Sequence, residues 1–169
     1  MKTLFLLLTP FLLFASNIQT ALDAANKGDY KTAISILQPL EKKGNVKATY
    51  AMSQMRYFGH GTQKNHKRAF GGFFKCSMTG HPGAQYYLGM MLLLGEGTKQ
   101  NDHEASIWLQ KSVTGGFEKA SCPLALLYIE GRGVSKNMEK ATRLLKIGSM
   151  KDIAECKNIS KLYNIKSTL

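Results

Sequence analysis

Apolar residues run along this chain in blocks, and the clearest blocks end at a pair of glycines. Gly59, Gly95 and Gly131 close three such blocks and lie 36 residues apart (95 − 59 and 131 − 95). A glycine after an apolar run supplies the left-handed residue that ends a helix, and an asparagine can accept a backbone N–H at the start of the next one. Each block is therefore predicted to be a helix followed by a Gly-x-Gly turn and a second helix. The other columns with this period are Gly61, Gly97 and Gly133, and Asn65, Asn101 and Asn137.

Alanines repeat with the same period on both sides of the glycines. A small side chain at a fixed step allows two helices to approach closely, and a larger one would push them apart. A constant period of this length is typical of a repeat protein whose unit is one helical hairpin. The alanine columns are Ala48, Ala84 and Ala120 before the glycines, and Ala33, Ala69, Ala105 and Ala141 after them.

We therefore expect an all-α chain of four helical hairpins and a final capping helix. The first helix of each hairpin is called helix A here and the second helix B. In the first hairpin the helices are expected at 18–27 and 30–43, and Pro39 should kink the second of them. Pro123 should delay or bend helix A of the fourth hairpin. The predicted bounds are about 18–44, 46–80, 82–116 and 118–149 for the hairpins, and 153–169 for the capping helix.

The first 20 residues have the pattern of a secretory signal. Lys2 is their only charge, residues 4–13 are apolar apart from Thr9 and Pro10, and small or polar residues follow at 15–17. The apolar run is too short to span a bilayer comfortably. We predict a signal peptide at 1–20, a secreted or periplasmic protein, and no transmembrane segment after cleavage. The alternative is that this stretch is a buried first helix.

Positive charge is large and unevenly distributed. The formal net charge is +12, and no Asp or Glu occurs between Lys42 and Gly95. A solvated outer surface is the simpler interpretation, and attraction to an anionic partner is the other. Nucleic acid is excluded as a partner by the secretory signal. In a second basic stretch, four residues are spaced to share one helix face, called the basic face: Lys136, Lys140, Arg143 and Lys146.

Motifs for catalysis are absent from the sequence. It contains no Ser-x-x-Lys, Gly-x-Ser-x-Gly, His-Glu-x-x-His or phosphate-binding glycine loop. The Gly-x-Gly pairs recur at the repeat period, so turn formation explains them. The histidines share no metal-ligand spacing and are interpreted as exposed loop residues: His60, His66, His81 and His103. We predict no enzyme, no metal and no cofactor.

The third hairpin carries a pattern of small and apolar residues that extends over both of its helices and ends in a lysine. The pattern consists of Ala84, Leu88, Gly89, Gly95, Gly97, Ala105, Trp108 and Lys111. This pattern resembles the Sel1-like repeat (SLR), a relative of the tetratricopeptide repeat. The first hairpin, from Gly28 onward, resembles the tetratricopeptide-like unit that often opens secreted bacterial members. The resemblance implies a right-handed α-solenoid that serves as an adaptor, and it names no partner. Ser53 and Gly72 depart from the pattern, so the second hairpin is expected to pack less tightly.

The three cysteines leave their pairing open. Secreted cysteines usually pair, and here one must be left over. Cys122 and Cys156 fall on the first helices of adjacent hairpins, so a bond between them is conceivable. The cysteine-rich relatives of the SLR family bridge the two helices within one hairpin, at a spacing that this chain lacks. The favoured interpretation is three buried or half-buried thiols, Cys76 included.

The resemblance to tetratricopeptide packing also indicates which helix A residues face the concave side. These residues form an unusually apolar set, and exposed apolar patches tend to be interaction sites. The alternative is that the superhelix or the N-terminal segment buries some of them. The candidate partner-binding residues are Tyr50, Gln54, Tyr57, Phe58, Tyr86, Met90, Leu93, Leu94, Leu126 and Ile129.

Taken together, the sequence favours a secreted, non-enzymatic helical-repeat adaptor that binds a protein or peptide through its concave helix A face. The alternative is a basic module that adheres to anionic cell-envelope polymers or host surfaces. An enzyme acting on cell-wall material or β-lactams ranks below both. Binding driven by charge would weaken as salt screens it, which separates the first two hypotheses.

Overall fold

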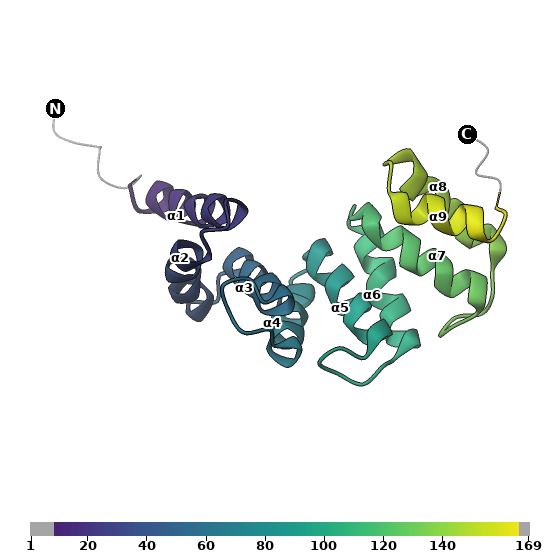
Figure 1. Cartoon of the computed structure of the whole chain (residues 1–169), viewed down its shortest axis with the longest axis horizontal. Helices are drawn as coiled ribbons and strands as arrows, with labels where there is room; N and C mark the ends of the chain where they lie inside the picture. The colour runs from purple at the N-terminus through teal and green to yellow at the C-terminus, as the bar shows by residue number, and fades with distance from the viewer. Residues whose placement is uncertain (1–8, 166–169) are drawn as a thin grey trace, which may run out of the picture. The chain divides into compact units, whose positions relative to one another are not determined.

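The computed structural model describes the backbone of residues 9–165 and the side chains of residues 18–165. All regular structure within this range is helical, as predicted (Figure 1). Residues 1–8 of the predicted signal and 166–169 of the predicted capping helix lie outside the described residues. The α-helices are α1 Thr9–Asn26, α2 Tyr30–Lys42, α3 Val46–Phe58, α4 His66–Met78, α5 Pro82–Leu94, α6 Asp102–Thr114, α7 Ser121–Glu130, α8 Met138–Met150 and α9 Ala154–Leu162.

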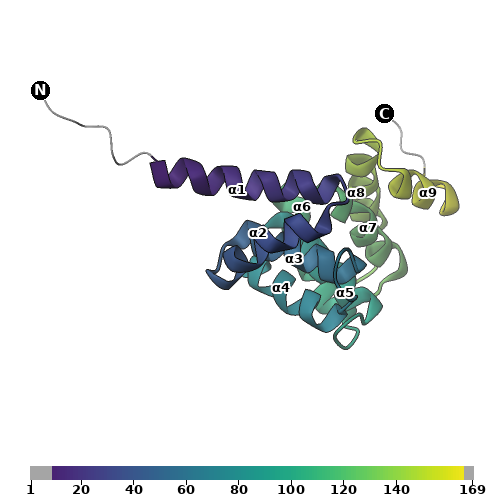
Figure 2. The same cartoon turned by 60° about the vertical axis from the view of Figure 1, so that its left-hand side comes forward.

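The helices follow one another as hairpins within two compact units, residues 1–72 and 73–169. In unit 1, α1 lies against α2 and α2 against α3 (Figure 2). In unit 2, α5 lies against α6, α7 against α8, and α8 against α9. Helices α3, α5 and α7 are therefore the helix A elements of the predicted second, third and fourth hairpins, and α4, α6 and α8 are their helix B elements.

The alanine columns lie in the core, where the repeat period predicted them. All seven alanines are 0% exposed. In unit 2, Ala120 and Ala141 belong to one apolar cluster that includes Leu124, Leu145 and Ile159. In unit 1, Ala33 and Ala48 belong to a second cluster. The absence of side-chain bulk at these positions permits close helix packing.

The glycine and asparagine columns act as helix ends, as predicted. Gly59, Gly95 and Gly131 follow α3, α5 and α7 in the left-handed conformation, with φ of 79°, 69° and 73°. The Asn101 and Asn137 side chains accept the backbone N–H groups of Glu104 and Lys140 at 3.0 and 2.9 Å. Asn65 accepts that of Arg68 at 2.9 Å. Asn45 and His81 begin α3 and α5 in the same way, which the sequence analysis did not predict.

The second glycine of the turn fills a role beyond chain reversal. A Cβ on Gly133 would lie 2.3 Å from the carbonyl carbon of Asp102, at the start of α6. A Cβ on Gly61 would lie 2.3 Å from the Cβ of Tyr30, at the start of α2. The turn of one hairpin thus lies directly against the start of helix B in the preceding hairpin. Only glycine allows this approach, because any side chain would overlap the neighbouring helix.

In both turns, the residue between the two glycines also contacts the start of helix B in the preceding hairpin. Arg132 donates from Nε and Nη2 to the Asp102 carboxylate at 2.9 and 3.1 Å. The Gly133 carbonyl oxygen lies 2.9 Å from His103 Nδ1. In unit 1, the His60 ring stacks on Tyr30 with centroids 5.0 Å apart. Within each unit, adjacent hairpins are therefore held together at their turns as well as through the core.

Two helix ends differ from the predicted bounds, and a third helix starts late, as predicted. Helix α1 begins at Thr9 rather than 18, because no glycine interrupts the apolar stretch and Pro10 sits in the first turn, where its missing N–H costs no bond. Helix α9 ends at Leu162 rather than 169, and Asn164 after it is left-handed with φ of 51°. Helix α7 starts late, as Pro123 predicted, after a 3-10 turn at Glu118–Ala120.

Two of the three cysteines form a disulfide, so the favoured interpretation of three thiols is wrong. Cys122 on α7 and Cys156 on α9 are bonded, with Cα atoms 4.9 Å apart. Both are 0% exposed. Gly148 on α8 leaves room for the bond, since a Cβ there would lie 2.0 Å from Cys156 Sγ. Cys76 is a buried thiol, as predicted.

Replacing Gly133 should test the contact between the turn and α6. Gly133→Ala should lower the free energy of unfolding by about 1–3 kcal/mol more than Gly116→Ala, because both are left-handed but only Gly133 lacks space. Urea unfolding followed by circular dichroism measures the difference. Gly116, with nothing within 4 Å of its Cβ position, is the matched control. Equal losses in the two variants would contradict the proposed role of the second glycine.

Removing the disulfide should destabilise the chain. The bond joins residues 34 apart in sequence. A loop of this size corresponds to about 3–4 kcal/mol in the chain-entropy account. We expect Cys122→Ala/Cys156→Ala to unfold at lower urea and to lose sensitivity to reducing agent, whereas Cys76→Ala should keep that sensitivity. An unchanged unfolding midpoint in the fully reduced wild type would show that the bond does not contribute.

Candidate partner-binding site

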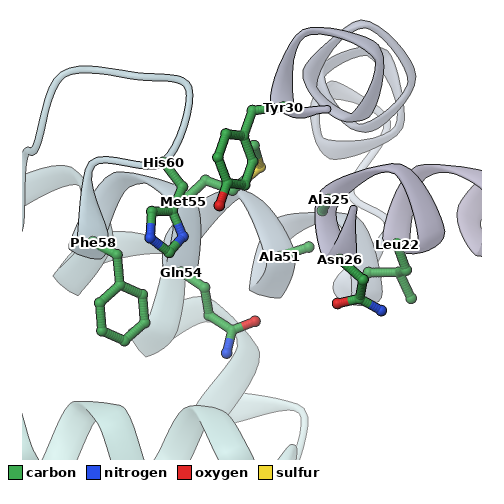
Figure 3. Close-up of a pocket in the computed structure, with 9 residues that line it drawn as sticks. All are labelled: Leu22, Ala25, Asn26, Tyr30, Ala51, Gln54, Met55, Phe58 and His60. Atoms are coloured by element: carbon green, nitrogen blue, oxygen red, sulfur yellow. The ribbon is translucent and has the colours of Figure 1, made fainter. Parts of the chain in front are cut away.

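Unit 1 contains a pocket of about 380 Å³ between α1, α3 and the turn that follows α3 (Figure 3). The start of α2 closes one side through Tyr30. The floor is apolar, and the edge carries aromatic rings and two carboxamides. The lining residues are Leu22, Ala25, Asn26, Tyr30, Ala51, Gln54, Met55, Phe58 and His60.

Helical spacing explains the contribution of α3. Ala51, Gln54, Met55 and Phe58 follow one another at steps of three, one and three residues, which places them on one face of a helix. Met55 is 4% exposed and belongs to the unit 1 core. Phe58 is 46% exposed. The face therefore passes from core to solvent within two turns, and the small side chain of Ala51 leaves the space that forms the pocket.

Stacked rings form one edge of the pocket. The His60 ring lies between Tyr30 and Phe58, with centroid distances of 5.0 and 5.5 Å and interplanar angles of 13° and 24°. Tyr57 meets Phe58 edge-on at 4.9 Å and stacks on His66 at 5.1 Å. This ring stack holds the α3–α4 turn against α2 and leaves Phe58 and His60 accessible to a partner.

Two carboxamides add to the polar groups of the pocket, which also include the Tyr30 hydroxyl and the His60 ring nitrogens. Gln54 Nε2 donates to the Tyr50 hydroxyl at 3.3 Å, and Asn26 is exposed at the end of α1. Figure 3 shows both carboxamides pointing to the same open side of the pocket. A carboxamide can donate and accept, so the pair is suited to the N–H and C=O groups of a peptide backbone.

Within unit 2, the predicted residues form a more buried surface. Tyr86, Met90, Leu93 and Leu126 are half-buried, and Leu94 is 58% exposed. The Tyr86 ring lies 5.3 Å from Tyr87 and 5.2 Å from Phe117. Burial raises the pKa of the Tyr86 phenol to about 12, and the Glu155 carboxylate and Tyr87 add to the effect. Tyr86 is therefore as much a packing residue as a surface one.

The outcome for the predicted partner-binding residues is mixed. Gln54 and Phe58 line the pocket, and Tyr50 and Tyr57 bond or stack with them. Ile129 is 3% exposed and packs in the unit 2 core, so its inclusion was wrong. The physical reason is that the end of α7 turns this side chain into the apolar cluster it shares with α8 and α9.

Seven of the nine pocket residues were missed by sequence reasoning. Three of them come from the end of α1, two are Ala51 and Met55 on α3, and the other two are Tyr30 and His60. The only sequence signal for His60 was its place between the paired glycines, which was interpreted as an exposed loop. Tyr30 stood out only as the residue after Gly28 and Asp29. The missed residues in α1 are Leu22, Ala25 and Asn26.

The predicted basic face is shorter than expected. Lys136 lies before α8, because Asn137 caps that helix, so only Lys140, Arg143 and Lys146 are on it. All three are exposed. Arg143 pairs with Glu139 one turn earlier. The Lys140 ammonium lies 5.3 Å from the Tyr128 ring centroid. Two of the three cations are thus already engaged by their own unit.

The described part of the chain shows neither a metal-binding cluster nor a membrane-spanning helix. Among residues 9–165, no group of three or more His, Cys, Asp or Glu side chains could hold a metal ion. Within the same range, no helix has the length and apolarity needed to cross a membrane.

A comparison with protein families identifies the repeat. The Sel1 repeat family matches residues 46–71, 82–117 and 119–152. These segments cover more than half of the sequence, so the chain belongs to the Sel1 repeat family. They correspond to the predicted second, third and fourth hairpins. A search of curated proteins found no match.

Solved structures show the same fold at low sequence identity. A Sel1 repeat protein from Oxalobacter formigenes matches with a TM-score of 0.76 and 24% identity, over 89% of this chain and 62% of that one. The c5321 protein, a protective antigen of uropathogenic Escherichia coli with an SLR fold, matches with a TM-score of 0.79 and 20% identity, over 89% of this chain and 33% of that one. Helicobacter pylori cysteine rich protein B matches with a TM-score of 0.52 and 14% identity, over 86% of this chain and 93% of that one. This chain therefore spans less than two thirds of the first two proteins.

Proposed function

We propose that the chain is a non-catalytic adaptor that binds a segment of a protein partner, with the unit 1 pocket as the anchoring point. Sel1 repeats are typically protein-interaction modules, which sets the general class. The observation that carries the finer proposal is the pocket itself. It combines an apolar floor, an exposed aromatic edge and two carboxamides on residues of unit 1.

The size and lining of the pocket suit one large apolar side chain of a partner. Small-ligand sites usually occupy about 300–1,000 Å³, so this pocket lies near the lower limit. Burying a side chain such as Phe or Leu contributes about 1.5–3 kcal/mol. Aromatic residues at the centre of an interface often dominate its energy. Phe58 and its ring neighbours would close over such a side chain, and Asn26 and Gln54 would bond the adjacent backbone.

The helix A residues of unit 2 provide a further apolar surface. Leu94 is the most exposed of the predicted set, and Met90 and Leu93 are half-buried beside it. We include Met90, Leu93, Leu94 and Leu126 as secondary contacts. Substituting Tyr86 would test binding poorly, because removing its ring would also disturb the packing of Tyr87 and Phe117.

An oxidising compartment is the proposed location. Disulfides persist in secreted and periplasmic proteins and are rare in the cytosol. The bond between Cys122 and Cys156 is consistent with the predicted signal at 1–20. The proposal therefore places the partner outside the cytoplasm or in the cell envelope.

The second candidate function is adhesion to an anionic envelope polymer or host surface through the basic face. The exposed Lys146 and the neighbouring Lys140 and Arg143 favour it. The ion pair of Arg143 with Glu139 counts against it, because a charge that is already paired attracts an external anion less strongly.

The two candidates predict opposite results for two variants. If the pocket anchors the partner, Phe58→Ala should weaken binding by about 1–2 kcal/mol or more, with little dependence on salt, because an apolar contact is lost. Lys140→Glu/Arg143→Glu should leave binding intact. Calorimetry with a partner identified by crosslinking in the envelope fraction measures both.

Ile107→Ala is the matched control for this experiment. Ile107 is 43% exposed, close to the 46% of Phe58, but it belongs to a helix B, α6. It should bind like the wild type. If the charge-reversal variant loses the partner while Phe58→Ala keeps it, the pocket is not the anchor and the adhesive function replaces it.

A further inference from the structure

Positive charge is concentrated in unit 1. Residues 18–72 contain nine Lys and Arg against three Asp and Glu, whereas residues 73–165 contain twelve against eight. Unit 1 therefore has an excess of six positive charges in the shorter stretch. An excess of this density sets up a positive potential at the surface and attracts anionic groups.

The three acidic residues of unit 1 are already engaged. Glu41 accepts two hydrogen bonds from Arg56, both at 2.6 Å, and each side chain is 19% exposed. Asp29 accepts the Thr32 backbone N–H at 3.1 Å at the start of α2. Asp23 accepts from Gln19 Nε2 at 2.9 Å. Three carboxylates against nine cations leave the unit with a net positive charge, although Asp29 is close enough to Lys31 to interact with its charge.

Three exposed lysines are neighbours of residues at the pocket, two of them in sequence and one in space. Lys27 directly follows Asn26 at the end of α1, and Lys31 directly follows Tyr30 in the first turn of α2. The Lys64 Cβ lies 3.4 Å from the Cβ position of Gly59, the residue after Phe58. None of the nine lining residues is acidic. Three exposed cations therefore lie next to residues that line the pocket or next to the turn beside it.

We propose that the pocket binds an acidic peptide segment, in which an aromatic or aliphatic side chain enters the pocket and flanking Asp or Glu residues pair with Lys27, Lys31 and Lys64. This inference rests on the proposed function and specifies the chemistry of the partner. The apolar side chain supplies most of the affinity. The carboxylates supply selectivity and faster association, because exposed ion pairs are individually weak but steer encounter.

A peptide fits these observations better than an anionic polymer. The floor formed by Leu22, Ala25 and Met55 has no charged group, and the ring stack beside it is apolar on its face. A polyphosphate or an acidic polysaccharide would satisfy the lysines but would leave this floor without an apolar group to cover it. Only a ligand with both an apolar side chain and carboxylates uses the whole site.

Fluorescence polarisation with three labelled peptides tests the inference on the whole chain. The peptides share a central phenylalanine in a glycine-serine context and are flanked by glutamates, glutamines or lysines. We expect the glutamate peptide to bind about threefold to tenfold more tightly than the glutamine peptide at low salt, because two or three exposed ion pairs contribute. The lysine peptide should bind most weakly. The differences should shrink at high salt.

Variants separate the anchor from the charges. Phe58→Ala should weaken the glutamate and glutamine peptides by the same factor, because it removes an aromatic ring and its ring contacts but no charge. Lys27→Glu/Lys31→Glu should reverse the preference, so that the lysine peptide binds best. Lys146→Glu, a change at an exposed lysine on α8, should leave the order unchanged. Circular dichroism and melting temperature confirm that each variant is folded.

The possible failures are distinguishable. If the three peptides bind with equal affinity and Phe58→Ala weakens all of them, the pocket is an anchor but the acidic preference is wrong. If the glutamate peptide binds equally well with its phenylalanine replaced by glycine, the lysines alone bind anions and the inference is overturned. If no peptide binds at any salt concentration, both the inference and the pocket's role in the proposed function fail.

Discussion

The contact that organises this structure is between a turn and the start of the helix B before it. At Gly133 and Gly61 the backbone lies so close to Asp102 and Tyr30 that no Cβ can be accommodated. Within each unit, this contact brings the turn of one hairpin against the hairpin before it, and the buried alanines pack beside it. It also positions the residue between the glycines. That residue is free to vary, and it bonds to the neighbour as Arg132 does to Asp102 or stacks on it as His60 does on Tyr30.

The candidate site is a direct result of this arrangement. His60 reaches Tyr30 because Gly61 brings the turn onto α2, and the same ring then supports Phe58. The aromatic edge of the pocket is therefore part of the joint between two hairpins. A partner that contacts Phe58 and His60 would bind to a rigid element whose geometry is fixed by backbone packing, which lowers the entropic cost of binding.

How much could be predicted from the sequence depended on the range of each interaction. The helix ends at Gly95 and Asn101 are set by local backbone geometry, and the burial of Ala105 by the repeat period, so both were visible in the sequence. The pocket was not, because Tyr30 and His60 come from different hairpins and α1 lies outside the glycine periodicity. The disulfide was missed for a related reason: Cys156 falls in an alanine column, where a small buried thiol is equally acceptable. Ile129 was misplaced because its packing partners lie on α8 and α9, and contacts between separate helices are not visible in a repeat period.

The bond between Cys122 and Cys156 also makes the two ends of the chain unequal in their local unfolding. Helical repeats generally open from their ends, since a terminal helix has neighbours on one side only. Here α9 is covalently tied to α7, so opening at the C-terminal end must carry both helices with it. Helix α1 has no such tie, and hydrogen exchange in the native state should be fastest at that end. Because α1 supplies one wall of the pocket, any occupant would suppress this opening and protect the amides of α1 and α2.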